Sequence, residues 1–219
     1  MRNKIYIART DALNDESVFQ RLYDSASPYR RRKTERLIFR KDKMLSLAAE
    51  ELLSIALADN GITDFSVVYG ENGKPYLRNN ELYFSLSHSG DMVMCAISEA
   101  EIGADTEKVT EIDLDIAKRY FYPEEYEMLT KIETDAERRD MFFRLWTLKE
   151  SYAKALGIGM LLPFDSFCID IKNGNITVRQ NANNGKFFFK EYELNDGYKY
   201  SVCGLFPQFE ENIAVVSLK

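Results

Sequence analysis

Apolar residues recur with two different spacings along this chain, and each spacing predicts a different kind of element. Apolar positions three and four residues apart lie on one face of a helix and are typical of helical segments. One such run contains Leu45, Leu52 and Ala56 and ends before Gly61, a residue type that often stops a helix. The predicted helices cover the basic run at 30–43, the segment that ends before Gly61, residues 114–120, a short segment after Pro123, and residues 136–156.

Shorter apolar runs between turn residues predict strands. A turn-like GENGKP segment and an SGD tripeptide separate three of these runs in the first half of the chain. The predicted strands lie at 4–7, 65–69, 82–87, 92–98, 102–108, 167–171, 176–179, 187–193, 198–206 and 213–218. Because helices and strands are mixed without regular strand–helix–strand alternation, the sequence predicts an α+β fold with antiparallel sheets.

The composition is that of a globular protein and argues against several classes of function. Hydrophobic residues make up 45% and charged residues 29% of the chain. No apolar run approaches the roughly 20 residues needed to cross a bilayer, and the apolar stretch at the N-terminus is too short for a secretory signal. We therefore expect a cytoplasmic protein without a membrane partner. The net charge of −6 argues against general nucleic-acid binding.

Cysteine and histidine usage argues against disulfides and against a structural zinc site. Cys95, Cys168 and Cys203 each lie in an apolar, strand-like run, where buried free thiols are expected. The chain has no CxxC pair and a single histidine, and this spacing argues strongly against a structural zinc site.

One strongly basic segment stands out from this acidic background. Between Arg30 and Lys43 there are eight basic residues against only Glu35 and Asp42. Such a run is compatible with a solvated helical face. It is equally compatible with a local site for an anion. The run alone leaves both interpretations open.

The segment Ile102–Glu107 contains two acidic residues separated by one position. On a strand, Asp105 and Glu107 would point to the same face. Two adjacent carboxylates repel each other unless a cation lies between them. Carboxylate oxygens suit Mg²⁺, which commonly uses one or two carboxylates together with the phosphates of a substrate. The alternative is a solvated strand edge, because this two-residue pattern is common.

The long predicted helix carries charges among bulky apolar residues. Glu150 and Lys154 are four residues apart and lie on the side of the helix that also carries Phe143 and Trp146. They are either a structural ion pair or the third ligand of a metal site and a phosphate-binding lysine. Lys149 points about 100° away from Glu150 and could approach the same anion from the side.

Small polar residues surround the only histidine. His88 follows Ser87 and precedes Ser89 and Gly90 at the end of a predicted strand, which suits donation to phosphate oxygens. A serine hydrolase is disfavoured, because there is no G-x-S-x-G elbow and adjacent strand residues point to opposite faces. The Gly73–Pro75 turn presents a lysine, but no P-loop or dinucleotide-binding fingerprint occurs in the chain.

Four segments occur together in the order and spacing of one protein family: GKPYL, SLSHSG, IGADTEK and FFRLWTLKESYAKALG. The W-x-x-K-E-S-x-x-K pattern follows G-x-D-x-E by about 40 residues, and the match runs from about Ser27 to Ile171. The sequence resembles the 4′-phosphopantetheinyl transferases of the larger, surfactin-synthetase type. The resemblance implies two similar α+β halves about a pseudo-twofold axis, residues 1–103 and 104–219, with coenzyme A bound between them.

The resemblance also assigns roles to individual residues. It implies that Asp105, Glu107 and Glu150 hold Mg²⁺ on the pyrophosphate, and that Glu125 lies near the catalytic centre. Asp105, Glu125, Glu150 and Lys154 are the predicted catalytic residues. The residues predicted to contact coenzyme A are Arg30, Lys33, Ser46, Lys74, Pro75, Ser87, His88, Ser89, Lys149 and Lys154.

The implied reaction is attack by a serine hydroxyl of an apo acyl or peptidyl carrier protein on the β-phosphate of coenzyme A, with 3′,5′-ADP leaving. Lys154 would stabilise the leaving group, and the proton would pass to Glu150 or to water polarised by the metal and Glu125. The sequence does not choose between these bases. Carrier proteins of this kind are generally acidic, which makes Lys118 and Arg119 candidate contacts.

The larger type resembled here carries both halves of the site in one chain, so a monomer is expected. Two alternatives remain at this point. One is a catalytically silent module that binds coenzyme A. The other is a nucleic-acid-binding protein that uses the basic run, which would leave the three carboxylates without a purpose.

Overall fold

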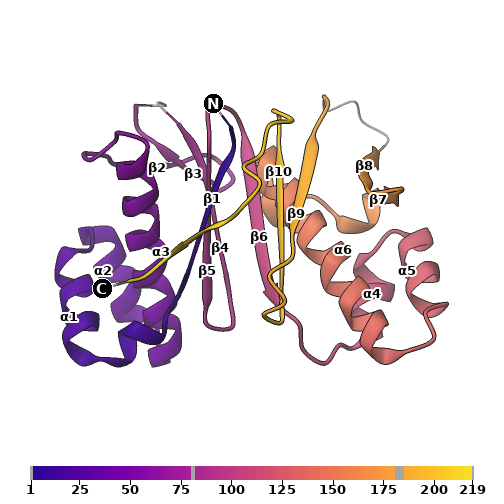
Figure 1. Ribbon diagram of the computed structural model, residues 1–219, viewed down its shortest axis with the longest axis horizontal. Coiled ribbons are helices and arrows are strands. Elements are labelled where there is room, and N and C mark those ends of the chain that lie inside the picture. Colours follow the sequence, from indigo (N-terminus) through magenta and orange to yellow (C-terminus); the bar gives the residue numbers. More distant parts are fainter. Residues whose placement is uncertain (1, 80–81, 181–184, 219) are drawn as a thin grey trace.

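The protein has two main β-sheets with helices on their outer sides (Figure 1). The computed structural model describes residues 2–79, 82–180 and 185–218. The first half contains β1 (Lys4–Arg9), η1 (Asp11–Asn14), α1 (Glu16–Ser25), α2 (Pro28–Arg36), α3 (Arg40–Asp59), β2 (Val67–Tyr69), β3 (Pro75–Leu77), β4 (Tyr83–Ser89) and β5 (Met92–Ser98). The second half contains β6 (Ile102–Lys108), α4 (Leu114–Tyr120), α5 (Pro123–Thr130), α6 (Asp135–Leu156), η2 (Gly159–Leu161), η3 (Phe164–Ser166), β7 (Phe167–Lys172), β8 (Asn175–Gln180), β9 (Phe188–Tyr192), β10 (Tyr198–Gly204) and β11 (Ala214–Val216). The predicted α+β class is confirmed.

Each half builds one main sheet with the same connectivity. The strand orders are β11-β1-β5-β4 and β6-β10-β9. In both halves a first strand leads through helices, the last of them long, to a second and a third main strand. The third strand then pairs antiparallel with both the first and the second. This repeat agrees with two similar halves, while the symmetry axis itself stays a prediction.

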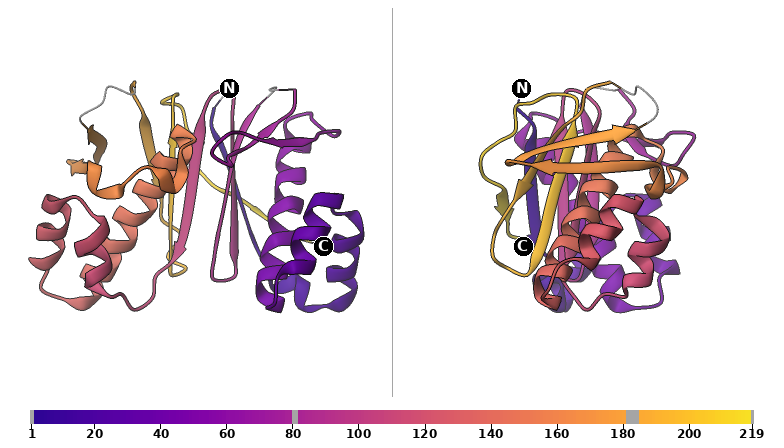
Figure 2. Two further views of the ribbon diagram at one scale, coloured as in Figure 1. Left: turned by 180° about the vertical axis from the view of Figure 1, so that it is seen from behind. Right: turned by 90° about the vertical axis from the view of Figure 1, so that its right-hand side faces the viewer.

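The two main sheets pack face to face, and α3 and α6 cover their outer faces (Figure 2). Strand β5 shows why its residues are all apolar or small. Val93 and Ile97 belong to the core under α3, whereas Met92 and Met94 belong to the core between the sheets. A strand that is buried on both faces has no position for a solvated side chain, so it reads as a continuous apolar run.

A glycine allows α6 to lie directly on β6. A Cβ atom on Gly103 would overlap the backbone of Ser151 and Ala155 and would come within 3.0 Å of the carbonyl carbon of Lys154. No other residue type leaves room for helix and strand backbones at this separation. The contact brings the last turns of α6 against the strand that carries Asp105.

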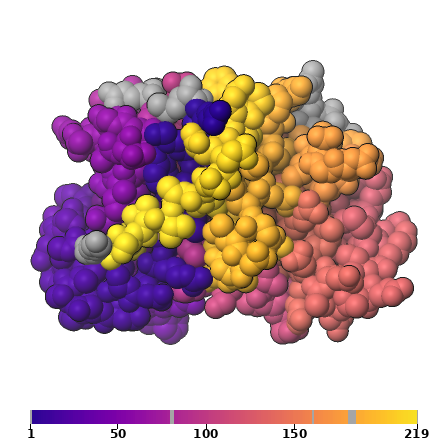
Figure 3. All heavy atoms as spheres, viewed as in Figure 1, coloured from indigo at the N-terminus to yellow at the C-terminus, as the bar shows by residue number. Residues whose placement is uncertain are grey.

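The C-terminal segment returns to the first half of the molecule. Strand β11 pairs parallel with β1, and Figure 3 shows the segment crossing the molecule towards the N-terminal helices. The predicted division at residue 103 falls inside β6, whereas the chain passes from one main sheet to the other between β5 and β6. The two halves are therefore defined by their main sheets, because the C-terminal strand β11 belongs to the sheet of the first half.

Several predicted elements are confirmed with their bounds, and others need correction. The predictions for β5, β6 and α4 match the structure. The basic run is not one helix, because Leu37 is extended (φ −74°, ψ 137°) and α3 begins only at Arg40. Strand β3 was not predicted, since Pro75 read as part of a turn, yet proline is tolerated at the first residue of a strand.

The cysteine prediction is confirmed, since Cys95, Cys168 and Cys203 are buried and free. Within the described residues, no helix combines the length and the apolar character that a membrane span requires.

Candidate active site

Serine side chains join the two sheets where β4 runs beside β6. The Ser85 hydroxyl accepts a hydrogen bond from the Ala104 N–H (2.9 Å). The Ser87 hydroxyl donates to Asp105 Oδ1 (2.7 Å), and that of Ser89 donates to the carboxylate of Glu107 (2.5 Å). Asp105 and Glu107 therefore both turn towards this seam, as their alternation on a strand predicts.

The ammonium group of Lys154 lies on Asp105. Lys154 Nζ is 2.6 Å from Asp105 Oδ1, 3.1 Å from the Ser87 hydroxyl and 3.2 Å from the carbonyl oxygen of Ala104. Asp105 is almost fully buried, while Lys154 keeps part of its side chain exposed. The close approach at Gly103 makes this pairing possible, because it sets the last turns of α6 against β6.

The second oxygen of Asp105 has no partner. Asp105 Oδ2 is buried and accepts no hydrogen bond. A buried acceptor without a partner is costly and rare in native proteins, and commonly indicates an ion or water that fills the place. Together with neighbouring carboxylates, this orphaned oxygen fits a hard divalent cation such as Mg²⁺ in its donor type.

The three predicted metal ligands share one electrostatic environment. Burial raises the pKa of Glu107 to about 7, and the charges of Asp105 and Glu150 act in the same direction, against Ser89 and Lys154. Burial and Asp105 also raise the pKa of Glu150, against Lys154. Within the described part of the chain, however, no three acidic, histidine or cysteine side chains converge closely enough to hold a metal ion together. Lys154 is the group that neutralises Asp105 here.

His88 lies on the face of β4 opposite the serines. Its strand neighbours on that face, Phe84 and Leu86, pack into the core under α3. Desolvation and the positive charges of Lys154, Lys33 and Arg30 lower the pKa of His88, although the residue keeps an exposed surface. The positive charges of groups on α2 and α6 thus both act on the end of β4, which favours an anion there.

Arg30 is fixed by residues of α3. Its Nε is 2.7 Å from Glu50, and one of its terminal nitrogens is 3.4 Å from the Ser46 hydroxyl. The hydroxyl of Thr34 donates to Ser46 as well (3.2 Å), and Lys33 stands exposed one turn away from Arg30. The structure therefore brings the three predicted residues Arg30, Lys33 and Ser46 together. Glu50 was missed, although its spacing of four from Ser46 places both on one helix face.

Lys74 and Pro75 lie on the hairpin that crosses the end of α6. Lys74 Nζ pairs with the carboxylate of Glu101 and donates to the carbonyl oxygens of Ile102 (3.1 Å) and Ala155 (3.4 Å). Pro75 opens β3. Lys74 is thus engaged at the junction of the two halves, next to the residue that follows Lys154, and its partner Glu101 carried no signal in the sequence.

Lys149 and Glu125 lie apart from this group of residues and pair with each other, so their roles in the site stay predictions. They form a salt bridge of 2.8 Å, with 0% and 2% of their side chains exposed. Lys149 also donates to the carbonyl oxygens of Phe164 (2.8 Å) and Phe167 (2.7 Å). Its three donors all have acceptors, as those of Lys154 do, but Lys149 is fully buried whereas Lys154 is partly exposed. The reason is that α6 is covered on several sides, so that Lys149 faces α5 and β7 instead of β6.

A tyrosine of the second half holds the turn between β4 and β5. Tyr198 donates its hydroxyl hydrogen to the Asp91 carboxylate and accepts from the Asp91 N–H (3.0 Å). Arg9 binds the same carboxylate at 2.7 Å. Gly90 is required beside it, because a Cβ atom there would overlap the Tyr198 hydroxyl. The turn carries Ser89, so this contact positions the partner of Glu107. Sequence reasoning had treated SGD only as a turn.

Comparisons with known proteins agree with this arrangement. Residues 101–203 match the model of the 4′-phosphopantetheinyl transferase superfamily, and this range includes Asp105, Glu107, Glu150 and Lys154. The chain is 34% identical over 219 residues to 4′-phosphopantetheinyl transferase Sfp of Bacillus subtilis (strain 168), covering 98% of this chain and 97% of that protein. It is 36% identical over 210 residues to 4′-phosphopantetheinyl transferase gsp of Aneurinibacillus migulanus, covering 94% and 86%. By this full-length similarity and by the family model, the chain belongs to the 4′-phosphopantetheinyl transferase superfamily.

Proposed function

We propose that this protein transfers the 4′-phosphopantetheine arm of coenzyme A to a serine hydroxyl of an apo carrier protein and releases 3′,5′-ADP. The observation that carries the proposal is the state of Asp105, a buried carboxylate with one oxygen on Lys154 and the other without a partner. The names of the full-length relatives support the same activity. A purely structural ion pair would not need the orphaned oxygen or the neighbouring Glu107 and Glu150.

The cationic groups at the end of β4 suit the phosphates of coenzyme A. Arg30 and Lys33 on α2, with the Ser46 hydroxyl, would take the 3′-phosphate, because charge-assisted hydrogen bonds to phosphate are strong. The positive charges of Arg30 and Lys33 also act on His88 and lower its pKa. Its lowered pKa keeps it neutral at pH 7, so that it would donate a single hydrogen bond and add no charge. Lys154 would contact the pyrophosphate.

Asp105, Glu107 and Glu150 would hold Mg²⁺. When bound, the ion would neutralise negative charge on the pyrophosphate and orient it for attack. In the described residues the three carboxylates do not yet converge as ligands. We therefore infer that Glu107 and Glu150 would move towards Asp105 to hold the ion, and that Lys154 would then give up part of its contact with Asp105. Released in this way, the ammonium group would be free to follow the phosphates.

The transfer itself forms one bond and breaks another. The serine oxygen of the carrier attacks the β-phosphorus, the bond from that phosphorus to the bridging oxygen breaks, and 3′,5′-ADP leaves with the bridging oxygen. Lys154 would stabilise charge on this leaving group. The serine proton needs an acceptor, and the burial of Glu125 in its salt bridge with Lys149 argues against Glu125 as the group that polarises a water. We therefore propose Glu150 as the base; it is half-buried, and the charges of Lys154 and Asp105 both act on it.

Both the cations and the carboxylates come from one chain, so a monomer would suffice for activity. The three free, buried cysteines suit a reducing compartment such as the cytoplasm. No observation favours the catalytically silent alternative or the use of the basic run for nucleic acid.

Intact-protein mass spectrometry of an apo carrier protein tests the proposal. Incubation with the enzyme, coenzyme A and Mg²⁺ should add one phosphopantetheine arm, roughly 340 Da, and EDTA should prevent the gain. Asp64→Ala, a change at an exposed aspartate far along the chain from the site, serves as the matched control for Asp105→Ala. If none of several apo carrier proteins gained mass in the presence of Mg²⁺, the proposed reaction would be wrong.

A further inference from the structure

Two large hydrophobic side chains stand in solvent between α2 and α3. The exposed fraction is 86% for Ile38 and 68% for Phe39. Single exposed apolar residues are common on protein surfaces, but an adjacent pair with so little burial adds almost nothing to the core. Such a pair, rimmed by polar residues, commonly marks a site of interaction.

The position of Phe39 also works against the helix that follows it. Phe39 is the N-cap of α3 and makes no side-chain capping hydrogen bond. Asp15 and Ser27 do cap α1 and α2 in the expected way. Polar residues are strongly preferred at this position because they satisfy a free backbone N–H. Phe39 therefore contributes neither to the buried core nor to the capping of α3, which indicates that its side chain serves an interaction with another molecule.

Exposed basic residues flank this pair along the chain. Arg32, Arg36 and Lys41 are exposed and form no ion pair within the described residues. Arg30 and Arg40, by contrast, are held by Glu50 and Glu16. We call Arg32, Arg36, Ile38, Phe39 and Lys41 the α2–α3 tip. Because the whole protein carries a net charge of −6, a positive tip with an apolar centre complements an acidic surface with an apolar spot.

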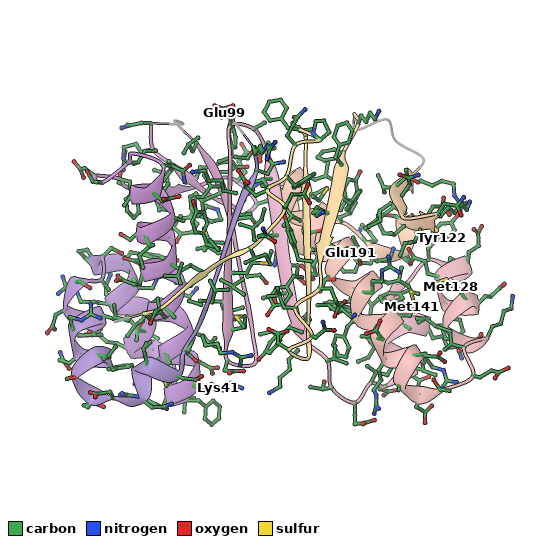
Figure 4. All side chains as sticks on the ribbon, viewed as in Figure 1. Lys41, Glu99, Tyr122, Met128, Met141 and Glu191 are labelled. Atoms are coloured by element: carbon green, nitrogen blue, oxygen red, sulfur yellow. The ribbon has the colours of Figure 1, made fainter. Side chains whose placement is uncertain are left out.

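The α2–α3 tip lies on the same edge of the molecule as the candidate active site. Figure 4 labels Lys41 at the lower edge of the first half. The turn between β4 and β5 and the connection from β6 to α4 reach the same lower edge in Figure 1. These two segments follow Ser89 and Glu107, so a partner bound at the tip would stand beside the end of the site.

We propose that the α2–α3 tip is a docking point for the acidic carrier protein whose serine is modified. The inference rests on the proposed function and adds to it a second contact area, in the half opposite to Asp105. An acidic protein fits better than an anionic bilayer, because only two apolar side chains project and the partner must bring a serine to the same edge. Arg30 and Lys33 bind the coenzyme, while the outer residues of the basic run guide the protein substrate.

Steady-state kinetics with separate titration of carrier and coenzyme A test this proposal. The double variant Ile38→Ser/Phe39→Ser should raise KM for the carrier about tenfold, with kcat and KM for coenzyme A unchanged. Arg36→Glu should raise it about fivefold at low salt and less at high salt, because salt screens exposed charges. The controls are Val215→Ser, at a residue that is 76% exposed on β11, and Arg21→Glu on α1. Thermal unfolding checks that every variant is folded.

Two results would overturn the proposal and leave the proposed function intact. One is a wild-type KM for the carrier in both tip variants while transfer proceeds. The other is that the wild type binds phosphatidylserine vesicles and the double variant does not, while the carrier kinetics of the two proteins are the same. That result would assign the tip to a membrane surface. If the wild type transfers nothing, the proposed function fails instead. Interferometry of carrier binding without coenzyme A then still decides whether the tip binds an acidic protein.

Discussion

The two halves of this protein share a connectivity but use it differently. In the first half, Tyr6 and Ala8 are the strand residues that face the long helix α3, and they fill a continuous apolar core. In the second half, the strand residues that turn to α6 and the seam are Gly103, Asp105 and Glu107. The strand face that packs an apolar core in the first half thus carries a buried carboxylate and a close helix contact in the second half.

This difference separates stability from chemistry within one chain. The first half presents its cations on exposed or half-buried positions of α2 and leaves its core apolar. The second half buries charged groups on α6 itself, at Lys149 and beside Asp105. Burial of charge is expensive unless each group is paired, so it is expected only where it has a function or a complete set of partners.

Asp105→Ala should produce the largest effect and should act on activity alone. Removing the carboxylate that holds Lys154 and supplies the orphaned oxygen should lower kcat by about a thousandfold or more. The fold should persist, because loss of one of several like charges relieves repulsion and Lys154 can turn to solvent. The comparison is sharpened by Asp59→Ala in the first half, which removes the partner of Tyr6 and should leave kcat unchanged. Transfer rates and thermal unfolding measure both. Near-normal activity of Asp105→Ala would end the assignment of the site.

Lys149→Met should act on stability and not on chemistry. It leaves the buried Glu125 carboxylate without its cation, and breaking a buried pair in this way costs about 3–5 kcal/mol. Adding Glu125→Gln should recover part of the loss, because the neutral amide needs no cation and its oxygen can still accept from the Ile169 N–H. Urea unfolding measures the free energies, and kcat per folded molecule should stay within about threefold of the wild type. If the Lys149→Met protein were as stable as the wild type and bound coenzyme A more weakly, Lys149 would be a coenzyme-binding residue and this prediction would be wrong.

Gly103→Ala should disturb the contact between β6 and α6. The added methyl group would overlap the backbone of Ser151 and Ala155, which cannot move as a flexible side chain can. We expect a loss of about 1–3 kcal/mol in the free energy of unfolding. Activity should fall with it, because Lys154 moves with α6 away from Asp105. Chemical denaturation and transfer kinetics, side by side, measure the two effects. An unchanged midpoint would show that the helix stands further from the strand than described.

Tyr198→Phe should have the smallest effect, and the effect should depend on pH. The Tyr198 hydrogen bond, together with Arg9, lowers the pKa of Asp91 from its ordinary value of 3.8. A carboxyl with a lowered folded-state pKa stabilises the protein above its unfolded-state pKa, and the contribution disappears as pH falls through the folded-state value. Tyr198→Phe should therefore cost about 1 kcal/mol at pH 7 and progressively less below pH 3.8. Thermal unfolding of the wild type and the variant at pH 7 and at a pH below 3.8 tests this prediction. A loss that grows on acidification would contradict it.

Local patterns in the sequence were sufficient for the elements and for part of the site. The strand alternation that places Asp105 and Glu107 together depends only on a period of two, and β6 has the predicted bounds. The same period explains why His88 and its serine neighbours serve different faces. The alternation of Ser85, Ser87 and Ser89 matched that of the carboxylates, and it was a signal for the seam that sequence reasoning did not use.

Contacts between distant segments could not be predicted in the same way. Lys149 and Glu150 are adjacent on one helix, yet one is buried in a structural pair and the other stands beside Asp105. Helical geometry gives the 100° between them but not what lies on each side. That depends on where α5, β7 and β6 pack, which is decided by the whole core. The roles of Glu50, Glu101 and Tyr198 were missed for the same reason.

The sequence by itself determined the fold class, the family and the positions of the acidic pair, because these follow from local periodicity and from motif spacing. Tertiary structure alone decided which charged groups meet. It set Lys154 on Asp105 through the close approach at Gly103, and it withdrew Lys149 and Glu125 into a buried pair. The physical reason is that the energy of a charged group depends on its burial and on its partners, and both come from segments far apart in the chain.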